Sequence, residues 1–178
     1  VLSVQKKIKN FYKNGQKWLT VVVENYIMNL QTLKKGVCNM FSGEQSHQLD
    51  AKNRIRIPSQ FKLPENEDLV FCKGTTQCIY VMPKSAVDKM CEEFYNVSLF
   101  DEEAQEAFSE YMSGFYTIEA DAQGRYLLPQ ALREYAGINK NVITVGVFNR
   151  LEIWSEEVKK EKRKQRSFAD SIKVLRSK

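Results

Sequence analysis

The chain has 178 residues and a formal net charge of +5, and 43% of its residues are hydrophobic and 11% aromatic. This composition can bury a core, which argues against wholesale disorder, and no apolar run approaches the about 18 residues of a membrane span. Four cysteines in a chain of this length do not make a disulfide-rich scaffold.

The positive charge lies at the two ends of the chain. Residues 1–40 carry a net charge of +6 and residues 155–178 a net charge of +5, whereas residues 41–154 carry −6. A nucleic-acid site in the acidic middle of the chain therefore has to be a local cluster of basic residues rather than a global field.

Residues 1–39 form a basic N-terminal extension for which two interpretations stay open. In the first, the extension is a genuine basic arm that is disordered or partly helical. In the second, it is a mis-assigned start, in which upstream DNA is read as protein. Lys35-Gly36-Val37 can be encoded with a ribosome-binding GGAG shortly before the ATG of Met40. The intact mass of the native protein distinguishes the two.

A ten-residue segment occurs twice in the chain, at an offset of 71 residues. The segments 49–58 and 120–129 have Asp, Ala, Arg and Pro at matching positions, namely Asp50 and Asp121, Ala51 and Ala122, Arg54 and Arg125, and Pro58 and Pro129. The match continues more weakly downstream, so the chain contains an internal duplication.

Both copies predict the same elements in the same order. An extended run (44–49 or 115–120) enters a tight turn, and a second run (54–57 or 125–128) leaves it. The following Pro suits the start of a short helix, which we expect over 129–135 with Gly137 as its stop, and in a shorter form after Pro58, where Pro64 interrupts. Two more strands follow in each copy, over 69–72 and 79–82 and over 142–145 and 151–154.

Asn53 and Gly124 occupy the same position in the two turns. Gly adopts positive φ freely, and Asn tolerates it better than most other residues. The pairing therefore predicts a left-handed backbone conformation at this position in both copies.

Helical spacing of apolar residues predicts two helices between the copies, over 87–94 and 104–115. The outer face of the second is acidic; we interpret it as a solvated face, with contact to a neighbouring subunit as the alternative. Ser155 can cap a further helix, whose basic tail over 159–166 is either a helix end or a frayed arm.

The sequence does not predict a catalytic, metal or cofactor site. Ser46, His47 and Asp50 lie close in sequence, but catalytic triads are assembled from distant segments. The spacing of Cys72 and Cys78 is not that of a zinc knuckle, and the glycines are too isolated to form a phosphate-binding loop. We expect reduced, mostly buried cysteines and a protein that is not an enzyme, with no cofactor and no small-molecule substrate.

The repeated Asp-x-x-x-Arg pattern, with His47 before its first copy, resembles the MraZ family. The resemblance covers residues 40–158 and includes 40–52, 133–137 and 145–154. It implies a bacterial transcriptional regulator with two AbrB-like (SpoVT-AbrB) modules in tandem. In the first copy the family usually has Gly where this chain has Asn53.

The fold implied by the resemblance is of the α+β class and β-rich, a pseudo-two-fold swapped-hairpin β-barrel. The implied divisions are a first module over 40–84, a helical connection over 85–114, a second module over 115–158 and a basic C-terminal helix or tail over 159–178.

The resemblance also implies partners. Family members form ring-shaped homo-oligomers in the cytoplasm, associated with the nucleoid. They bind short direct repeats of double-stranded DNA in the promoter of the division and cell-wall gene cluster, which includes their own gene. Two alternatives stay open, an AbrB-like antitoxin and a nucleoid or assembly protein that does not read sequence.

The duplicated turn is the predicted DNA-binding site. An Asp carboxylate can bind turn amides and orient the loop, and an Arg at the loop exit can bind guanine or phosphate through two hydrogen bonds. We therefore expect the DNA-binding residues to be Lys52, Arg54, Arg56, Gln123 and Arg125, and the loop-positioning residues to be Asp50, Asn53, Asp121 and Gly124. The alternative is an Asp–Arg salt bridge that only holds each hairpin.

Overall fold

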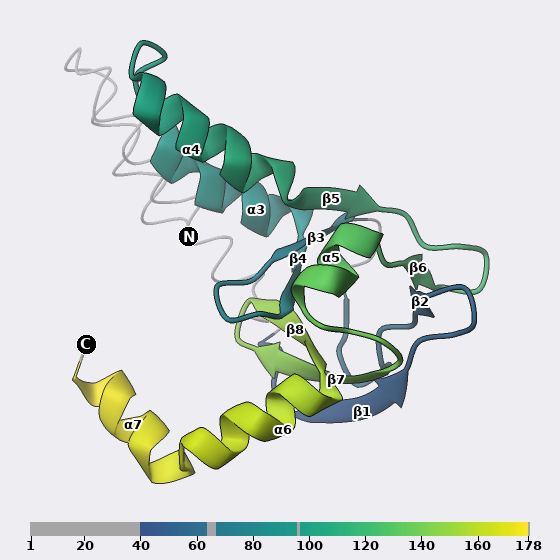
Figure 1. The fold of residues 1–178 in the computed structure, drawn as a ribbon. Helices are drawn as coiled ribbons and strands as arrows, with labels where there is room; N and C mark the ends of the chain where they lie inside the picture. Colours follow the sequence, from purple (N-terminus) through teal and green to yellow (C-terminus); the bar gives the residue numbers. More distant parts are fainter. Residues whose placement is uncertain (1–39, 64–66, 96, 178) are drawn as a thin grey trace, which may run out of the picture. The chain divides into compact units, whose positions relative to one another are not determined.

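The computed structural model describes residues 40–63, 67–95 and 97–177 (Figure 1). The two interpretations of residues 1–39, together with Cys38 and Pro64, lie outside the described residues. No helix in the described part of the chain is long and apolar enough to cross a membrane.

The elements follow the duplication seen in the sequence. The first copy contains four strands, β1 (Glu44–Gln48), β2 (Arg54–Ile55), β3 (Leu69–Lys73) and β4 (Ile79–Pro83). The second copy contains β5 (Phe115–Ile118), β6 (Tyr126–Leu127), β7 (Asn141–Val147) and β8 (Arg150–Ser155), with α5 (Gln130–Tyr135) after β6. Helix α3 (Lys84–Cys91), the 3₁₀ helix η2 (Glu92–Phe94) and α4 (Glu102–Ser113) separate the copies, and α6 (Glu156–Gln165) and α7 (Phe168–Arg176) follow them.

Six strands form one antiparallel sheet in the order β1-β7-β8-β4-β3-β5, and β2 pairs with β6 in a separate ribbon. The pairings cross between the copies. Strand β1 pairs with β7, its counterpart β5 pairs with β3, and the equivalent strands β4 and β8 meet at the centre. Each copy therefore completes the sheet of the other.

The α+β class is confirmed, but the barrel is not closed. Within the described residues β1 and β5 are the two edges of the sheet and do not pair with each other. The short β2–β6 ribbon covers one face, so the core is closed by packing on that face rather than by a continuous ring of strand pairing.

The core lies between this face of the sheet and the β2–β6 ribbon. Side chains alternate along a strand, so every second residue of the central strands points toward the ribbon. Phe71, Ile79 and Ile153 from the sheet pack against Ile55 and Leu128 from the ribbon segments, and all five are at most 1% exposed. Burial of such side chains contributes about 1.5–3 kcal/mol each to folding, so the core holds the ribbon in place.

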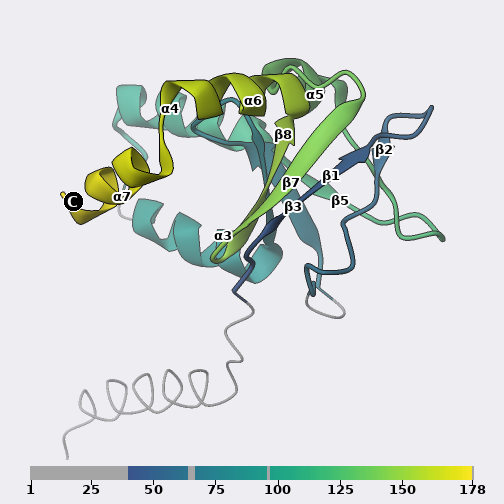
Figure 2. The ribbon, with the colours of Figure 1, turned by 90° about the horizontal axis from the view of Figure 1, so that it is seen from below.

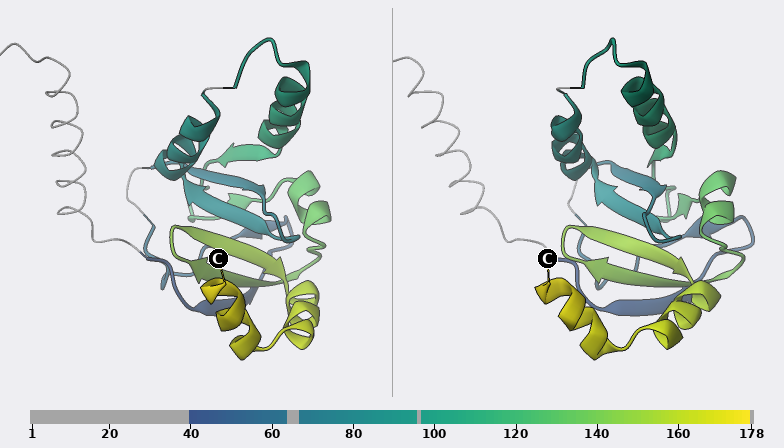
Figure 3. Two further views of the ribbon diagram at one scale, coloured as in Figure 1. Left: turned by 90° about the vertical axis from the view of Figure 1, so that its left-hand side faces the viewer. Right: turned by 60° about the vertical axis from the view of Figure 1, so that its left-hand side comes forward.

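Helix α3 covers part of the opposite face, where Val87 packs near Val70, Cys72 and Met82. Helices α3 and α4 both lie beyond the β3–β5 end of the sheet (Figure 3), and aromatic contacts join η2 to α4. Phe94 of η2 lies 5.5 Å from Phe108 between ring centroids. The acidic face of α4 is exposed on the single chain, and both interpretations of its charges, a solvated face and contact with a neighbouring subunit, stay open.

Two local predictions need correction. After Pro58 the chain forms only a turn, in which Phe61 N donates to Pro58 O at 3.0 Å, rather than a short helix. Ser155 does precede α6, but its side chain is 1% exposed and makes no capping hydrogen bond. Of the two interpretations of the basic tail, the helix end is confirmed, because these residues form the last turns of α6. The chain then forms α7, which the sequence pattern did not predict.

The cysteines of the described region are free thiols. Cys72 and Cys78 are buried, as expected, and burial raises their thiol pKa values to about 12 and about 11. Both thiols are therefore protonated at neutral pH and behave as small apolar side chains.

Candidate nucleic-acid interface

The two copies of the repeated turn lie side by side at the end of the β2–β6 ribbon (Figure 2). Residues 50–54 connect β1 to β2, and residues 121–125 connect β5 to β6. The ribbon pairs Arg54 with Leu127 and Ile55 with Tyr126, and Leu128 N donates to Asn53 O at 3.2 Å. Strand pairing therefore fixes the position of one turn relative to the other.

An aspartate organises each turn from the inside. Asp50 Oδ1 accepts from the backbone N–H groups of Lys52 and Arg54, both at 2.9 Å. Asp121 Oδ1 accepts in the same way from Gln123 at 2.9 Å and Arg125 at 3.0 Å. These hydrogen bonds are the kind that a loop-positioning aspartate makes, and the role itself stays a prediction.

The position shared by Asn53 and Gly124 has a left-handed backbone in both turns, which confirms the prediction. The φ angle is 59° at Asn53 and 71° at Gly124. The N–H groups of both residues donate to the aspartate carbonyl three positions earlier, at 3.0 and 2.8 Å. Asn53 therefore gives the first turn the same backbone geometry that Gly124 gives the second.

Each arginine binds the aspartate of its own turn. Arg54 Nε and Nη2 lie 2.7 and 2.6 Å from Asp50 Oδ2. Arg125 Nε and Nη2 lie 2.9 and 2.8 Å from Asp121 Oδ2. The salt bridge within each hairpin, proposed as the alternative to DNA contact, is therefore formed in this structure.

The arginines also connect the two turns to each other. Arg54 Nη1 donates to Asp121 Oδ2 at 3.0 Å, and Arg125 Nη1 lies 3.6 Å from Asp50 Oδ2. We call this set of Asp50, Arg54, Asp121 and Arg125 the arginine clamp. Its two-fold arrangement mirrors the strand pairing of the sheet.

Contacts within the clamp shift the pKa values of Asp50, Arg54 and Asp121. The hydrogen bond from the Arg54 side chain lowers the pKa of Asp50 to about 2, and that from the Arg125 side chain does the same for Asp121. The same contact with Asp50 raises the pKa of Arg54. All four groups are partly exposed, with side-chain exposures of 23–29%.

The remaining predicted contact residues lie around the clamp on exposed surface. Lys52 and Gln123 are exposed at the turn tips, and Arg56 is exposed beside them and donates through Nη2 to Gln123 O. All nine predicted site residues therefore gather at one end of the ribbon. The four clamp residues bind one another there, and Lys52, Arg56 and Gln123 present polar surface to solvent.

A pocket of about 570 Å³ adjoins the turns and contains residues that the sequence did not predict. It is lined by Arg56, Gln123 and Gly124 from the predicted site and by residues of β1 and of the turn after β2, including Gln45, Gln48 and Ser59. The run of polar residues in β1 is the signal that could have identified it.

His47 also lines this pocket, and its Nε2 lies 2.8 Å from Thr144 Oγ1. Burial lowers the pKa of His47, so the ring is neutral at pH 7. The side chain thus has the packing and hydrogen-bonding position that the sequence favoured over a triad. Within the described residues, no group of three or more His, Cys, Asp or Glu side chains is placed to hold a metal ion.

Comparison with known proteins places the chain among its relatives. A family model described as MraZ protein, antitoxin-like, matches residues 40–109 and 111–168. A protein of Finegoldia magna named transcriptional regulator MraZ is 41% identical over 118 residues, which cover 66% of this chain and 82% of the relative. The protein of the same name from Clostridium beijerinckii is 37% identical over 133 residues, or 75% of this chain and 94% of the relative.

The matched region contains both copies of the turn and all four residues of the arginine clamp. The match extends over most of each relative, so it reflects the whole folded unit rather than one shared motif. The chain therefore belongs to the MraZ family.

Proposed function

We propose that this chain is a DNA-binding transcriptional regulator that reads short direct repeats of double-stranded DNA through its two turns. The proposed target is the promoter of the division and cell-wall gene cluster, including the chain's own gene. The observation that carries the proposal is the pair of equivalent turns, locked side by side by the arginine clamp, with exposed Lys52, Arg56 and Gln123 around it.

The residues around the clamp divide the task by their chemistry. Lys52 and Arg56 are exposed cations suited to phosphate oxygens, which position a protein on DNA without reading its sequence. The exposed amide of Gln123 suits the edge of adenine in the major groove. Arg54 and Arg125 position the turns, and about a quarter of each side chain is exposed and can contact the DNA.

A single subunit offers few such contacts, so assembly is part of the proposal. We infer a ring-shaped homo-oligomer, in which each subunit presents one pair of turns to one repeat. Linked sites bind far more tightly together than singly, because the second contact forms at a high effective concentration. Direct repeats, rather than one long site, suit such an array.

The two copies are proposed to be tandem AbrB-like modules whose hairpins are exchanged. The crossed pairing of β1 with β7 and of β5 with β3 supports this assignment. It also explains why the two turns sit at one end of one ribbon, since β2 and β6 come from different copies. The role is proposed to be non-enzymatic and exercised in the cytoplasm, at the nucleoid.

The proposal is tested by footprinting the DNA upstream of the chain's own gene, followed by a binding titration with the protected repeats. Arg54→Ala and Arg125→Ala are expected to weaken specific binding by about tenfold or more, as loss of a charge-assisted contact does. Lys62→Ala is the matched control, because Lys62 is exposed outside the turns.

The result separates the rival functions. If both arginine variants keep specific binding while their circular dichroism stays native, the turns are not the DNA-binding site. If the wild type binds repeated and scrambled duplexes equally at the same salt concentration, the assembly role without sequence reading is correct instead. An antitoxin would require a toxin partner in addition.

A further inference from the structure

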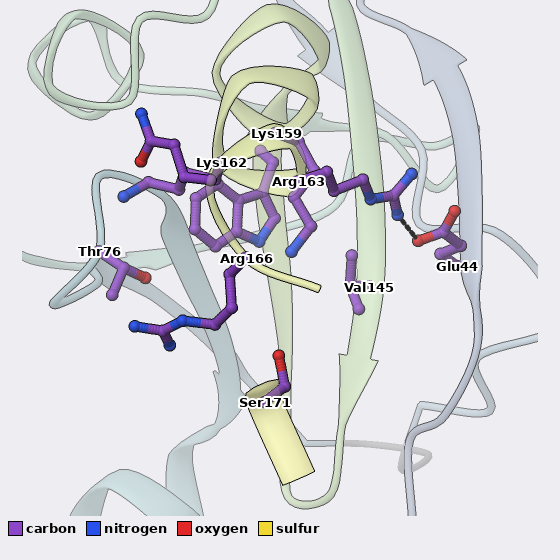
Figure 4. Close-up of a pocket in the computed structure, with 10 residues that line it drawn as sticks. Glu44, Thr76, Val145, Lys159, Lys162, Arg163, Arg166 and Ser171 are labelled. Carbon is purple, nitrogen blue, oxygen red and sulfur yellow. Dashed lines mark hydrogen bonds and ion pairs between the residues drawn. The ribbon is translucent and has the colours of Figure 1, made fainter. Parts of the chain in front are cut away.

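A second basic site lies on the other face of the sheet, away from the turns. Ile153 belongs to the core, so the next residue along β8, Trp154, points to the opposite face. There Trp154 and Val145 line a pocket of about 660 Å³, and Figure 4 shows Val145 of β7 beside the basic side chains of α6. Helix α6 forms one wall. Thr76, from the turn between β3 and β4, and Ser171, from α7, complete the lining.

Four cations of α6 and its C-cap line this pocket at helical spacing. Lys159, Lys162, Arg163 and Arg166 are separated by three, one and three positions, which places them on one side of the helix. The pocket contains one carboxylate, Glu44, which pairs with Arg163. Its lining residues therefore carry a net positive charge.

The lysines of α6 that lie outside the pocket are paired with glutamates of the same helix. Lys160 Nζ lies 2.8 Å from Glu156 Oε1, and Lys164 Nζ lies 3.3 Å from Glu161 Oε2. Within the described part of the chain, Lys159, Lys162 and Arg166 have no carboxylate oxygen within 4.0 Å. The helix thus pairs its lysines outside the pocket and leaves those facing the pocket without an anion.

Lys159 is half-buried and has no carboxylate partner among the described residues. Its Nζ lies 4.1 Å from the ring centroid of Trp154, and burial lowers its pKa. The nearby Glu152 carboxylate is already engaged, because it accepts from Arg150 Nη2 at 2.9 Å and from Trp154 Nε1 at 3.1 Å. Partial burial of an ammonium group without an anion carries a free-energy cost that a bound anion would offset.

We propose that this pocket binds a small ligand with several phosphate charges, such as a phosphate ester or polyphosphate. Arginine guanidinium groups bind phosphate oxygens through two hydrogen bonds, and the hydroxyls of Thr76 and Ser171 supply neutral donors. The volume is in the range of small-molecule sites. The site is independent of the DNA-binding turns, because the ribbon that carries them packs on the core face.

The test is calorimetric titration of the full chain with tripolyphosphate, and with orthophosphate as the weaker probe, at constant ionic strength. The double variant Lys162→Gln/Arg166→Gln removes two exposed pocket cations and is expected to weaken tripolyphosphate binding by about tenfold or more. The matched control, Lys160→Gln/Lys164→Gln, removes the same charge from the same helix outside the pocket. We expect it to bind within about twofold of the wild type.

A second readout locates the ligand. The chain has two tryptophans, so Trp18→Phe leaves Trp154 as the single indole. Tripolyphosphate is expected to change its emission, because the ligand draws Lys159 and Lys162 from the ring, and the change should vanish in the double variant.

Four outcomes would overturn the proposal. In the first, the wild type does not bind tripolyphosphate. In the second, both double variants lose binding equally, which makes the general charge of the helix responsible. In the third, the pocket variant weakens duplex DNA binding as much as tripolyphosphate binding, which makes the pocket part of the DNA surface. In the fourth, the pocket variant dissociates the oligomer in sedimentation, which makes the pocket a subunit contact.

Discussion

Arg54 of the first copy donates through Nη1 to Asp121 Oδ2 of the second, at 3.0 Å. This hydrogen bond joins residues 67 positions apart, and it ties the two repeated turns into one unit. A carboxylate shared between two guanidinium groups fixes the orientation of both, since each Arg fork has a preferred geometry.

The first prediction concerns this shared carboxylate. Asp121→Asn keeps the shape of the side chain but removes its negative charge. Both arginines then lose a charge-assisted partner, and the net charge of the site rises by one. We expect non-specific DNA binding to strengthen and specific binding to weaken. The ratio of affinities for repeated and scrambled duplexes should fall by about tenfold.

The measurement is a pair of titrations at one salt concentration. The control is Glu134→Gln, which changes the net charge by the same amount at an exposed side chain of α5. It should keep the wild-type ratio of affinities for repeated and scrambled duplexes. An unchanged ratio in Asp121→Asn would show that the clamp does not orient the reading surface.

The second prediction follows from the pKa values of the clamp. Asp50 and Asp121 have pKa values lowered from 3.8 to about 2, first by the side-chain hydrogen bonds of Arg54 and Arg125. A carboxylate whose folded pKa is depressed stabilises the fold above its unfolded pKa, and this stabilisation is lost as the pH falls through the folded value. The clamp should therefore weaken between about pH 4 and pH 2.

Urea unfolding from pH 5 to pH 2 measures this effect. The wild type should be more stable than Asp50→Asn/Asp121→Asn at pH 5, and the difference should shrink toward pH 2. A difference that stays constant across this range would mean that the aspartates do not titrate with the clamp.

Sequence reasoning found the parts of this site but not their connection. The Asn53/Gly124 pairing identified the left-handed position, because only few residue types adopt positive φ. The ion pairs within each turn were predicted as an alternative, since their partners are four positions apart. The bond between Arg54 and Asp121 was not, because it depends on β2 pairing with β6.

Other features depend on tertiary packing in the same way. The open edges of the sheet, at β1 and β5, follow from which strands pair and not from the residues of any one strand. Ser155 has the residue type of a helix cap, but burial against the sheet takes its side chain away from that role. Helix α7 has few buried contacts, so apolar periodicity toward the core could not reveal it.

The third prediction compares two glycines. A Cβ at Gly146 would lie 2.4 Å from Ser42 N and 2.6 Å from Phe41 C, where the chain before β1 runs antiparallel beside the end of β7. A Cβ at Gly124 meets no atom within 4 Å, so only its positive φ opposes a side chain. Gly124→Ala should therefore cost about 1 kcal/mol, and Gly146→Ala about 3 kcal/mol, because backbone has to move.

Chemical denaturation gives both values from the transition midpoints. Asn53→Gly is the control for the left-handed position and should be nearly neutral, since Asn53 already has a φ of 59°. If Gly146→Ala costs no more than Gly124→Ala, the assigned close approach at Gly146 is wrong.

The last prediction separates phosphate contacts from sequence reading. Lys52 is exposed at a turn tip, and no carboxylate oxygen of the described residues lies within 4.0 Å of its Nζ. Removing one phosphate contact lowers the steepness with which affinity falls with salt, by about 0.9 in the logarithmic slope for each bound subunit. Lys52→Gln should therefore bind repeated and scrambled duplexes more weakly by the same factor, with a shallower salt slope. Lys62→Gln should retain the wild-type slope, because Lys62 is exposed away from the turns. A variant at Lys52 that lost affinity only for the repeats would instead place this side chain on a base, and the division of roles between Lys52 and Gln123 would be reversed.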